Sequence, residues 1–168
     1  MEKMWSPWRS AYIDSFNKGA KDEGCVFCAA QKCDIHDEKS LVVFKGLYTF
    51  IVLNLYPYNN GHMMVVPYRH LSSFTELTQE ENSDIMQNLQ VASKALAEVM
   101  KPQGFNIGAN IGKAAGAGID THLHFHVVPR WNGDTNFMPA LGDVKVISQD
   151  LLTTKNNIIK AIDGILSL

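Results

Sequence analysis

Three histidines alternate with apolar residues in segment 121–130, whose sequence is THLHFHVVPR. Successive side chains of a β-strand point to opposite faces of its sheet, so a strand here would place His122, His124 and His126 on one face. The apolar residues between them would enter the hydrophobic core from the other face. Each buried neutral imidazole brings a donor and an acceptor that need partners, so core packing alone explains three in strict alternation poorly. The segment predicts a strand with one chemically active face.

Length and composition bound the rest of the chain. The 168 residues, 46% hydrophobic and 19% charged, suit a single globular domain over residues 1–168. We expect an N-terminal arm at 1–24, a core at 25–131, and a pocket loop with a C-terminal helix at 132–168. The net charge of −2, without a Lys/Arg block, argues against nucleic acid as a partner. No stretch reaches the ~18 apolar residues of a membrane span, and the N-terminus lacks a signal-peptide core. We expect a cytoplasmic protein without a membrane partner.

The hydrophobic pattern predicts an α+β fold. Three runs of β-forming residues, at 41–45, 48–54 and 62–67, are joined by short links, which favours an antiparallel meander. A fourth strand is expected at 105–111, and the histidine segment is the fifth. These segments predict a five-stranded, mostly antiparallel sheet with helices packed on one face.

Capping signals and apolar periodicity mark the helices. Thr78 and Glu81 fit a capping box at the start of a long amphipathic helix. Ser148 is expected to cap a C-terminal helix whose apolar face suits a core or a partner subunit. Aromatic residues at helical spacing within 8–16 predict a short N-terminal helix or arm.

The cysteines indicate a metal site. Cys25 and Cys28 form a C-x-x-C pair, which in a cytosolic protein is either a zinc site or a redox motif. A polar, Gly-rich loop precedes the pair instead of the strand that a redox motif needs, so we favour zinc. A structural zinc takes four N or S ligands, and His70, after the third strand, with His122, at the start of the fifth, would complete the set. We expect one structural zinc per chain and a free thiol at Cys33.

A catalytic metal held by all three histidines is the other use of the triad. In an extended strand, His122 and His126 lie about 13 Å apart, which is too far to ligate one ion at ~2.0–2.1 Å without a sharp bend. We therefore expect His124 and His126 to face a pocket. A neutral imidazole needs no special activation to attack phosphorus, so these residues indicate nucleotidyl or phosphoryl transfer through a covalent phosphohistidine.

The Gly-rich segment 112–120 would flank this pocket. It lacks the spacing and the Ser or Thr of a Walker A loop. Backbone N–H groups among its small residues, including Gly116 and Gly118, can approach a phosphate closely, although a flexible connection between strands explains the composition equally well. Together with Asn110 and His126, these amides could bind the charged oxygens of a phosphoryl group.

At these residues the chain resembles the histidine triad (HIT) superfamily. Segment 122–128, HLHFHVV, matches the family motif His-φ-His-φ-His-φ-φ without departure, and the resemblance covers residues 25–131. It implies a HIT-like α+β fold, a homodimer whose sheet continues across the interface, and a purine nucleotide as ligand. His124 would be the nucleophile that takes the α-phosphate, and His126 would contact the phosphate or the bridging oxygen.

The resemblance also implies ligands and a branch. The zinc-containing members match Cys25, Cys28, His70 and His122, the family's ribose-contacting position falls on Asn54, and its phosphate-side asparagine on Asn110. Segments 5–9 and 130–137 are similar to bacterial diadenosine tetraphosphate phosphorylase-like proteins. Many family members carry Gln or Ser at the position of Gly118. This departure bears on which leaving groups are accepted and on whether phosphate or water resolves the intermediate.

Three functions are consistent with these residues. The first is an enzyme that cleaves dinucleoside polyphosphates, such as diadenosine tetraphosphate, or related nucleotide conjugates through a nucleotidyl-His124. With water as acceptor this enzyme is a hydrolase, and with phosphate it is a phosphorylase. The second is a nucleotide-sensing module with a structural zinc and no turnover. The third is a metalloenzyme that uses the triad as ligands.

Overall fold

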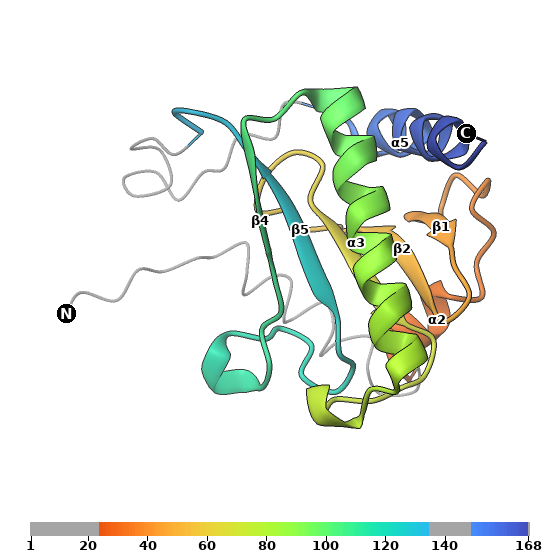
Figure 1. Cartoon of the computed structure of the whole chain (residues 1–168), viewed down its shortest axis with the longest axis vertical. Helices are drawn as coiled ribbons and strands as arrows, with labels where there is room; N and C mark the ends of the chain where they lie inside the picture. Colours follow the sequence, from red (N-terminus) through yellow and green to blue (C-terminus); the bar gives the residue numbers. More distant parts are fainter. Residues whose placement is uncertain (1–23, 135–148, 168) are drawn as a thin grey trace.

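The computed structural model describes residues 24–134 and 149–167, and within them the chain forms one five-stranded sheet (Figure 1). The strand order is β1-β2-β3-β5-β4, and every neighbouring pair is antiparallel. Short links join the first three strands, as the sequence predicts. The strands are β1 (Val42–Lys45), β2 (Thr49–Leu53), β3 (Met63–Pro67), β4 (Gly104–Gly108) and β5 (Phe125–Arg130).

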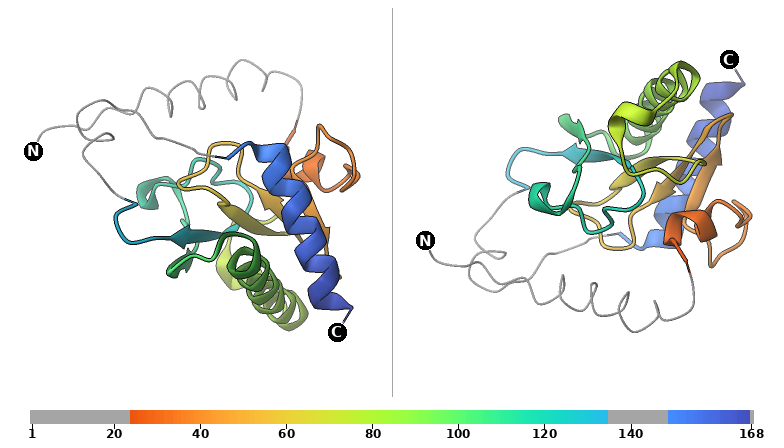
Figure 2. Two further views of the ribbon diagram at one scale, coloured as in Figure 1. Left: turned by 90° about the horizontal axis from the view of Figure 1, so that it is seen from above. Right: turned by 90° about the horizontal axis from the view of Figure 1, so that it is seen from below.

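Two long helices cover one face of this sheet (Figures 1 and 2). They are α3 (Gln79–Met100) and α5 (Leu151–Leu166), and they pack on each other and on the strands. The main hydrophobic core lies between them and the sheet; it includes Ile51, Val65, Leu89, Val127 and Ile158. This arrangement confirms the predicted α+β fold with helices on one face.

A short helix lies against the opposite face. Helix α2 (Val26–Ala30) begins directly after Cys25 and buries Phe27. Phe27 packs in a second, smaller apolar cluster with side chains of β1, β2 and β3. The sequence pattern did not predict this helix, because five residues are too few to show a helical period. It matters for the site, because the histidines lie on this same side.

The helix ends follow from local chemistry. Thr78 accepts a hydrogen bond from the backbone of Glu81, whose carboxylate accepts one from the backbone of Thr78, so the predicted capping box is confirmed. The prediction for α5 is wrong by two residues: its N-cap is Asp150, which accepts from the Thr153 amide at 2.9 Å. Asp and Ser cap equally well, so the residue next to the first helical turn takes the role. Ser148 lies outside the described residues.

The histidine segment is only partly a strand. Strand β5 begins at Phe125, where pairing with β3 starts, so His126 lies in the strand while His122 and His124 precede it. The residues before Phe125 are held by a different contact, the Leu123 amide donating to the Leu71 carbonyl at 2.7 Å. The alternation persists nonetheless, because all three histidines are buried on the α2 side of the sheet.

Some expectations fall on residues that the structure does not describe. These are the N-terminal helix at 8–16 and most of the pocket loop after residue 134. Among the described helices, none combines the length and the apolar character that crossing a membrane requires.

Candidate active site and metal centre

Four buried imidazoles gather on the α2 side of the sheet. His62, His122, His124 and His126 expose between 0% and 8% of their surface. The ring centroids of His124 and His126 are 4.9 Å apart, and those of His62 and His126 are 5.0 Å apart. His62, which precedes β3, has no role in the sequence-based prediction. The feature that could have indicated a role for His62 is its position, as a histidine at the edge of an otherwise wholly apolar strand.

Hydrogen bonds assign the proton positions of His62 and His126. The Tyr58 amide donates to His62 Nδ1 at 3.0 Å, so that nitrogen is an acceptor and the ring proton lies on Nε2. His62 Nε2 is 2.9 Å from His126 Nδ1 and therefore donates to it. His126 in turn carries its own proton on Nε2. The hydrogen bond from His62 thus holds His126 in the tautomer whose Nε2 atom is a hydrogen-bond donor.

His124 is held in the opposite state. Its Nδ1 lies 2.9 Å from the carbonyl oxygen of His122, which can only accept, so Nδ1 carries the proton. The Nε2 atom of His124 therefore keeps a free lone pair. Two adjacent imidazoles thus offer complementary groups, a nucleophilic nitrogen on His124 and an N–H donor on His126.

Burial keeps these rings neutral. Desolvation lowers the pKa of His124 below its usual value, although the hydrogen bond to the His122 carbonyl opposes the change. Desolvation, with a smaller contribution from His124, lowers the pKa of His126 from 6.5 to about 4. Both rings are therefore uncharged at neutral pH, which agrees with the proton positions that the hydrogen bonds require.

A second cluster lies beside the first. The side-chain ligand atoms of Cys25, Cys28, His70 and His122 all lie within 4.8 Å of one another. The Nδ1 atom of His122 is 3.1 Å from Cys25 Sγ and 3.7 Å from Cys28 Sγ, and His70 Nδ1 is 3.3 Å from Cys28 Sγ. Ligands on a tetrahedral zinc would be separated by about 3.3–3.8 Å, given its bond lengths. The spacing of the four residues therefore fits a zinc ion.

The surroundings of the cluster also favour a cation. His122 Nε2 donates to the Pro67 carbonyl at 2.9 Å, which leaves Nδ1 unprotonated and aimed at the cysteines. Burial and the neighbouring Cys25 raise the pKa of Cys28, so two thiolates are unfavourable here without a positive charge. Within residues 24–134 and 149–167, the metal-ligand cluster takes only His122 of the triad, while His124 and His126 bond to other groups.

Comparison with known proteins identifies the family of the chain. Residues 36–133 match the HIT domain family, which is more than half of the chain. The chain belongs to the HIT domain family.

The similar proteins include named enzymes and a metal-bound protein. A protein of Mycobacterium tuberculosis named AP-4-A phosphorylase is 42% identical over 159 residues, covering 92% of this chain and 81% of its own. Adenosine 5'-monophosphoramidase hnt1 of Schizosaccharomyces pombe is 31% identical, covering 64% and 75%. The crystal structure of a Zn-bound histidine triad family protein from Mycobacterium smegmatis superposes with a TM-score of 0.67 at 26% identity, covering 86% of this chain and 96% of that one. These matches support a nucleotide hydrolase or transferase.

The other predicted binding residues lie in two places around this HIT site. Asn54 is within the histidine network, because its Nδ2 atom is 3.3 Å from His62 Nδ1 and its Oδ1 accepts from the Tyr56 amide. Asn110 is half-buried between β4 and the Gly-rich segment. The roles of these residues toward a nucleotide stay predictions.

The Gly-rich segment is a defined turn. Gly112 and Gly116 have φ angles of 79° and 88°, which residues with a side chain rarely adopt. The two glycines flank the 3-10 turn η2 (Lys113–Ala115). Gly118 is exposed, and the next residue, Ile119, packs against the cluster that contains Phe27. Part of the glycine content is therefore a backbone requirement, and the segment lies on the histidine side of the sheet.

Proposed function

We propose that this HIT protein cleaves dinucleoside polyphosphates, such as diadenosine tetraphosphate, or related nucleotide conjugates through a nucleotide bound covalently to His124. One observation carries the proposal. The hydrogen bonds give opposite tautomers to two imidazoles whose ring centroids are 4.9 Å apart, so His124 has a lone pair on Nε2 and the neighbouring His126 has an N–H on Nε2. A nucleophile next to a donor is what in-line transfer of a phosphoryl group needs.

The first step forms a bond between His124 Nε2 and the α-phosphorus, and the bond from phosphorus to the bridging oxygen breaks. The positive charge that develops on the imidazole of His124 is stabilised by the His122 carbonyl, which accepts from Nδ1. The departing polyphosphate leaves as an anion, so His126 serves it with a hydrogen bond and a full proton transfer is unnecessary. His62 keeps His126 in its donor tautomer.

The second step returns the enzyme to its starting state. An acceptor oxygen, from water or inorganic phosphate, attacks the same phosphorus, and the phosphorus bond to His124 breaks, which returns the imidazole to its neutral form. An attacking water releases its proton to solvent. Water as acceptor gives AMP, and phosphate gives ADP. We favour phosphate, because the relative with 42% identity is named AP-4-A phosphorylase.

Two measurements test this function. Diadenosine tetraphosphate is incubated with the protein with and without phosphate, and ADP that appears only with phosphate identifies the phosphorylase. Because the phosphorus–nitrogen bond of a phosphohistidine is acid-labile, the protein is quenched in alkaline denaturant; wild type should then carry the label of an adenine-labelled substrate, whereas His124→Ala should carry none and lose turnover by at least about 1000-fold. Full turnover in His124→Ala would refute the covalent step. Tight nucleotide binding without any product would identify a sensing module instead.

We further propose that Cys25, Cys28, His70 and His122 bind one structural zinc per chain. When bound, the ion would supply no step of the reaction and would hold its four ligands in place. The geometry of the cluster and the Zn-bound relative support this assignment. Metal analysis should give one zinc per chain in the wild type and in His124→Ala. A zinc content that falls with His124 would favour the triad as ligand set.

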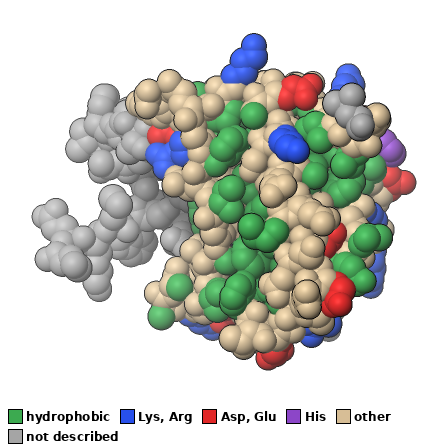
Figure 3. Space-filling view, in the orientation of Figure 1, with side chains coloured by type: hydrophobic (Ala, Val, Ile, Leu, Met, Phe, Trp, Pro, Cys, Tyr) green, Lys and Arg blue, Asp and Glu red, His purple; other side chains and the backbone are tan. Residues whose placement is uncertain are grey.

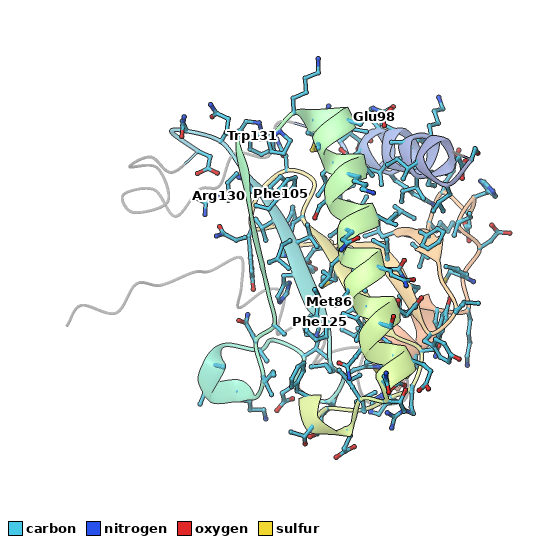
Figure 4. The ribbon with its side chains drawn as sticks, in the orientation of Figure 1. Met86, Glu98, Phe105, Phe125, Arg130 and Trp131 are labelled. Atoms are coloured by element: carbon cyan, nitrogen blue, oxygen red, sulfur yellow. The ribbon has the colours of Figure 1, made fainter. Side chains whose placement is uncertain are left out.

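We also propose a homodimer that forms through β4. This strand is an edge of the sheet, carries no charged side chain, and exposes 51% of Ile107. Hydrophobic side chains form a band between α3 and β4 (Figure 3), and Met86, Phe105 and Phe125 mark α3, β4 and β5 along it (Figure 4). A second copy of β4 would pair antiparallel with the first and cover this band.

Light scattering on a sizing column tests the dimer. Ile107→Lys should reduce the mass from that of two chains to that of one, because the lysine would be buried without a partner. Leu47→Lys is the matched control, since Leu47 is 84% exposed in the turn between β1 and β2. A dimer that survives Ile107→Lys would place the interface elsewhere.

A further inference from the structure

The C-x-x-C pair encloses a phenylalanine that reaches the active site. Phe27 lies between Cys25 and Cys28 in the sequence and is 4% exposed. Its ring centroid is 5.0 Å from that of His124 and 5.5 Å from that of His122. The short helix that carries two metal-ligand candidates therefore also places an aromatic ring directly against the proposed nucleophile.

The sheet does not hold the nucleophile. Backbone pairing of β5 with β3 begins only at Phe125, so the residues before it depend on other contacts. The backbone is held through Leu123, whose amide donates to Leu71, and through His122, whose ring donates to Pro67. These bonds fix the backbone before the strand, but they leave the ring of His124 to be oriented by its own neighbours.

Among the described residues, three groups restrain the ring of His124. Its Nδ1 donates to the His122 carbonyl, which defines one point of the ring. His126 approaches at an interplanar angle of 81°, and Phe27 lies against the ring at an angle of 44°. Rotation of the imidazole about the bond from Cβ to Cγ breaks this hydrogen bond, and the flanking rings add a steric barrier to the same rotation. Phe27 is the flanking ring that is anchored outside the sheet.

We propose that Phe27 is a positioning residue for His124, and that the metal-ligand cluster around Cys25 and Cys28 holds it in place. The inference rests on the proposed function, because it takes His124 as the nucleophile. Without the aromatic ring, His124 rotates and its Nε2 atom leaves the line of attack on phosphorus. A misplacement of about 1 Å at a reacting centre costs about 100-fold in rate. The metal centre is thereby coupled to the chemistry although it touches no substrate.

Kinetics of two leucine variants test this role. Phe27→Leu keeps an apolar side chain and removes the ring, and Phe50→Leu is the matched control. Phe50 belongs to the same apolar cluster, is fully buried, and has its described ring contact with Tyr68 instead of a histidine. In Phe27→Leu we expect kcat to fall about 10- to 100-fold with KM changed less than about 3-fold. Phe50→Leu should keep kcat within about 3-fold at a similar loss of stability.

A spectroscopic measurement separates positioning from packing. Imidazole 15N NMR of the zinc-loaded protein should show His124 of the wild type and of Phe50→Leu in the single tautomer protonated at Nδ1. Phe27→Leu should show exchange broadening or a mixture of tautomers, with one zinc per chain retained. Phe27→Met is a second variant without the ring and should behave like Phe27→Leu.

The proposal is overturned if Phe27→Leu matches Phe50→Leu in kcat and retains a single His124 tautomer. It is also overturned if Phe27→Leu loses zinc and added zinc restores kcat, because the metal alone would then set the position. If the wild type forms no covalent nucleotide, the proposed function fails, yet the tautomer comparison still decides whether Phe27 orients His124.

Discussion

His62 shows how a residue can matter without touching the reacting atoms. Its Nδ1 is held by the Tyr58 amide, and its Nε2 faces His126 Nδ1 at 2.9 Å. A backbone amide cannot change its role as a donor, so the direction of both hydrogen bonds is fixed by the main chain. The donor state of His126 therefore has its origin in a turn of the backbone at Tyr58.

Replacing His62 tests this chain of hydrogen bonds. In His62→Ala the buried Nδ1 of His126 loses its donor, so the ring is free to place its proton on the wrong nitrogen. We expect kcat to fall about 10- to 100-fold, the usual cost of losing such an orienting partner. His62→Gln, which can still donate from its amide, should recover part of the loss. Equal activity of His62→Ala and the wild type in a steady-state assay would disprove the arrangement.

The buried imidazole of His126 also predicts how stability depends on pH. Its pKa in the folded protein is about 4, below the 6.5 of an exposed histidine, so the unfolded chain takes up the proton first. The free energy of unfolding should therefore fall as pH drops from about 6.5 to about 4, by about 3 kcal/mol from this residue, and level off below that. Urea unfolding of His126→Asn should show a smaller decline over the same window. Any metal loss at low pH affects both proteins alike, so parallel curves would contradict the assignment.

At the scale of elements, local signals predict the scaffold, and long-range contacts decide the site. Thr78 and Glu81 announce the start of α3 because capping is a contact within one turn. The start of β5 and the short helix α2 cannot be read in this way. The first depends on where β3 stops pairing, and the second on the sheet face that receives Phe27. The role of His62 could not be predicted for the same reason, since its partner His126 is 64 residues away in the sequence.

A buried carboxylate joins α3 to the β1–β2 turn. One oxygen of Asp84 accepts three hydrogen bonds. The donors are the backbone amide of Tyr48 at 3.0 Å, the Thr49 hydroxyl at 2.7 Å and the side-chain amide of Asn88 at 3.2 Å. Asp84→Ala leaves the Tyr48 amide and the buried Thr49 hydroxyl without this acceptor, while the Asn88 side chain keeps its bond to Thr49 Oγ1, so the free energy of unfolding should fall by about 2–3 kcal/mol. Asp84→Asn, which retains an oxygen, should lose less. Chemical denaturation measures both, and kcat of the folded variants should stay near the wild-type value because the turn lies away from the histidines.

At the scale of the whole molecule, the sheet separates the main hydrophobic core from the histidine site. The large core lies under α3 and α5, while the imidazoles and the metal-ligand cluster share the other face. The sequence could predict the members of the cluster because Cys25, Cys28, His70 and His122 combine a spacing pattern with positions at strand ends. It could not predict that His122 serves both groups, as a ligand candidate through its ring and as the acceptor for His124 through its carbonyl.

Removal of the metal should therefore weaken the molecule as a whole. The cluster links α2, the segment after β3 and the segment before β5, so its loss releases three parts of the chain from one another. Cys28→Ser should lose zinc and lower Tm by about 10 °C, at about 2–4 °C per kcal/mol for a chain of this size. Cys33→Ser is the matched control, because Cys33 lies outside the cluster and its thiol donates a hydrogen bond to the Ala29 carbonyl, which a serine hydroxyl can also do. Calorimetry of both variants, with zinc measured on the same samples, decides the matter: equal Tm values would mean that the four ligand candidates do not hold the fold together.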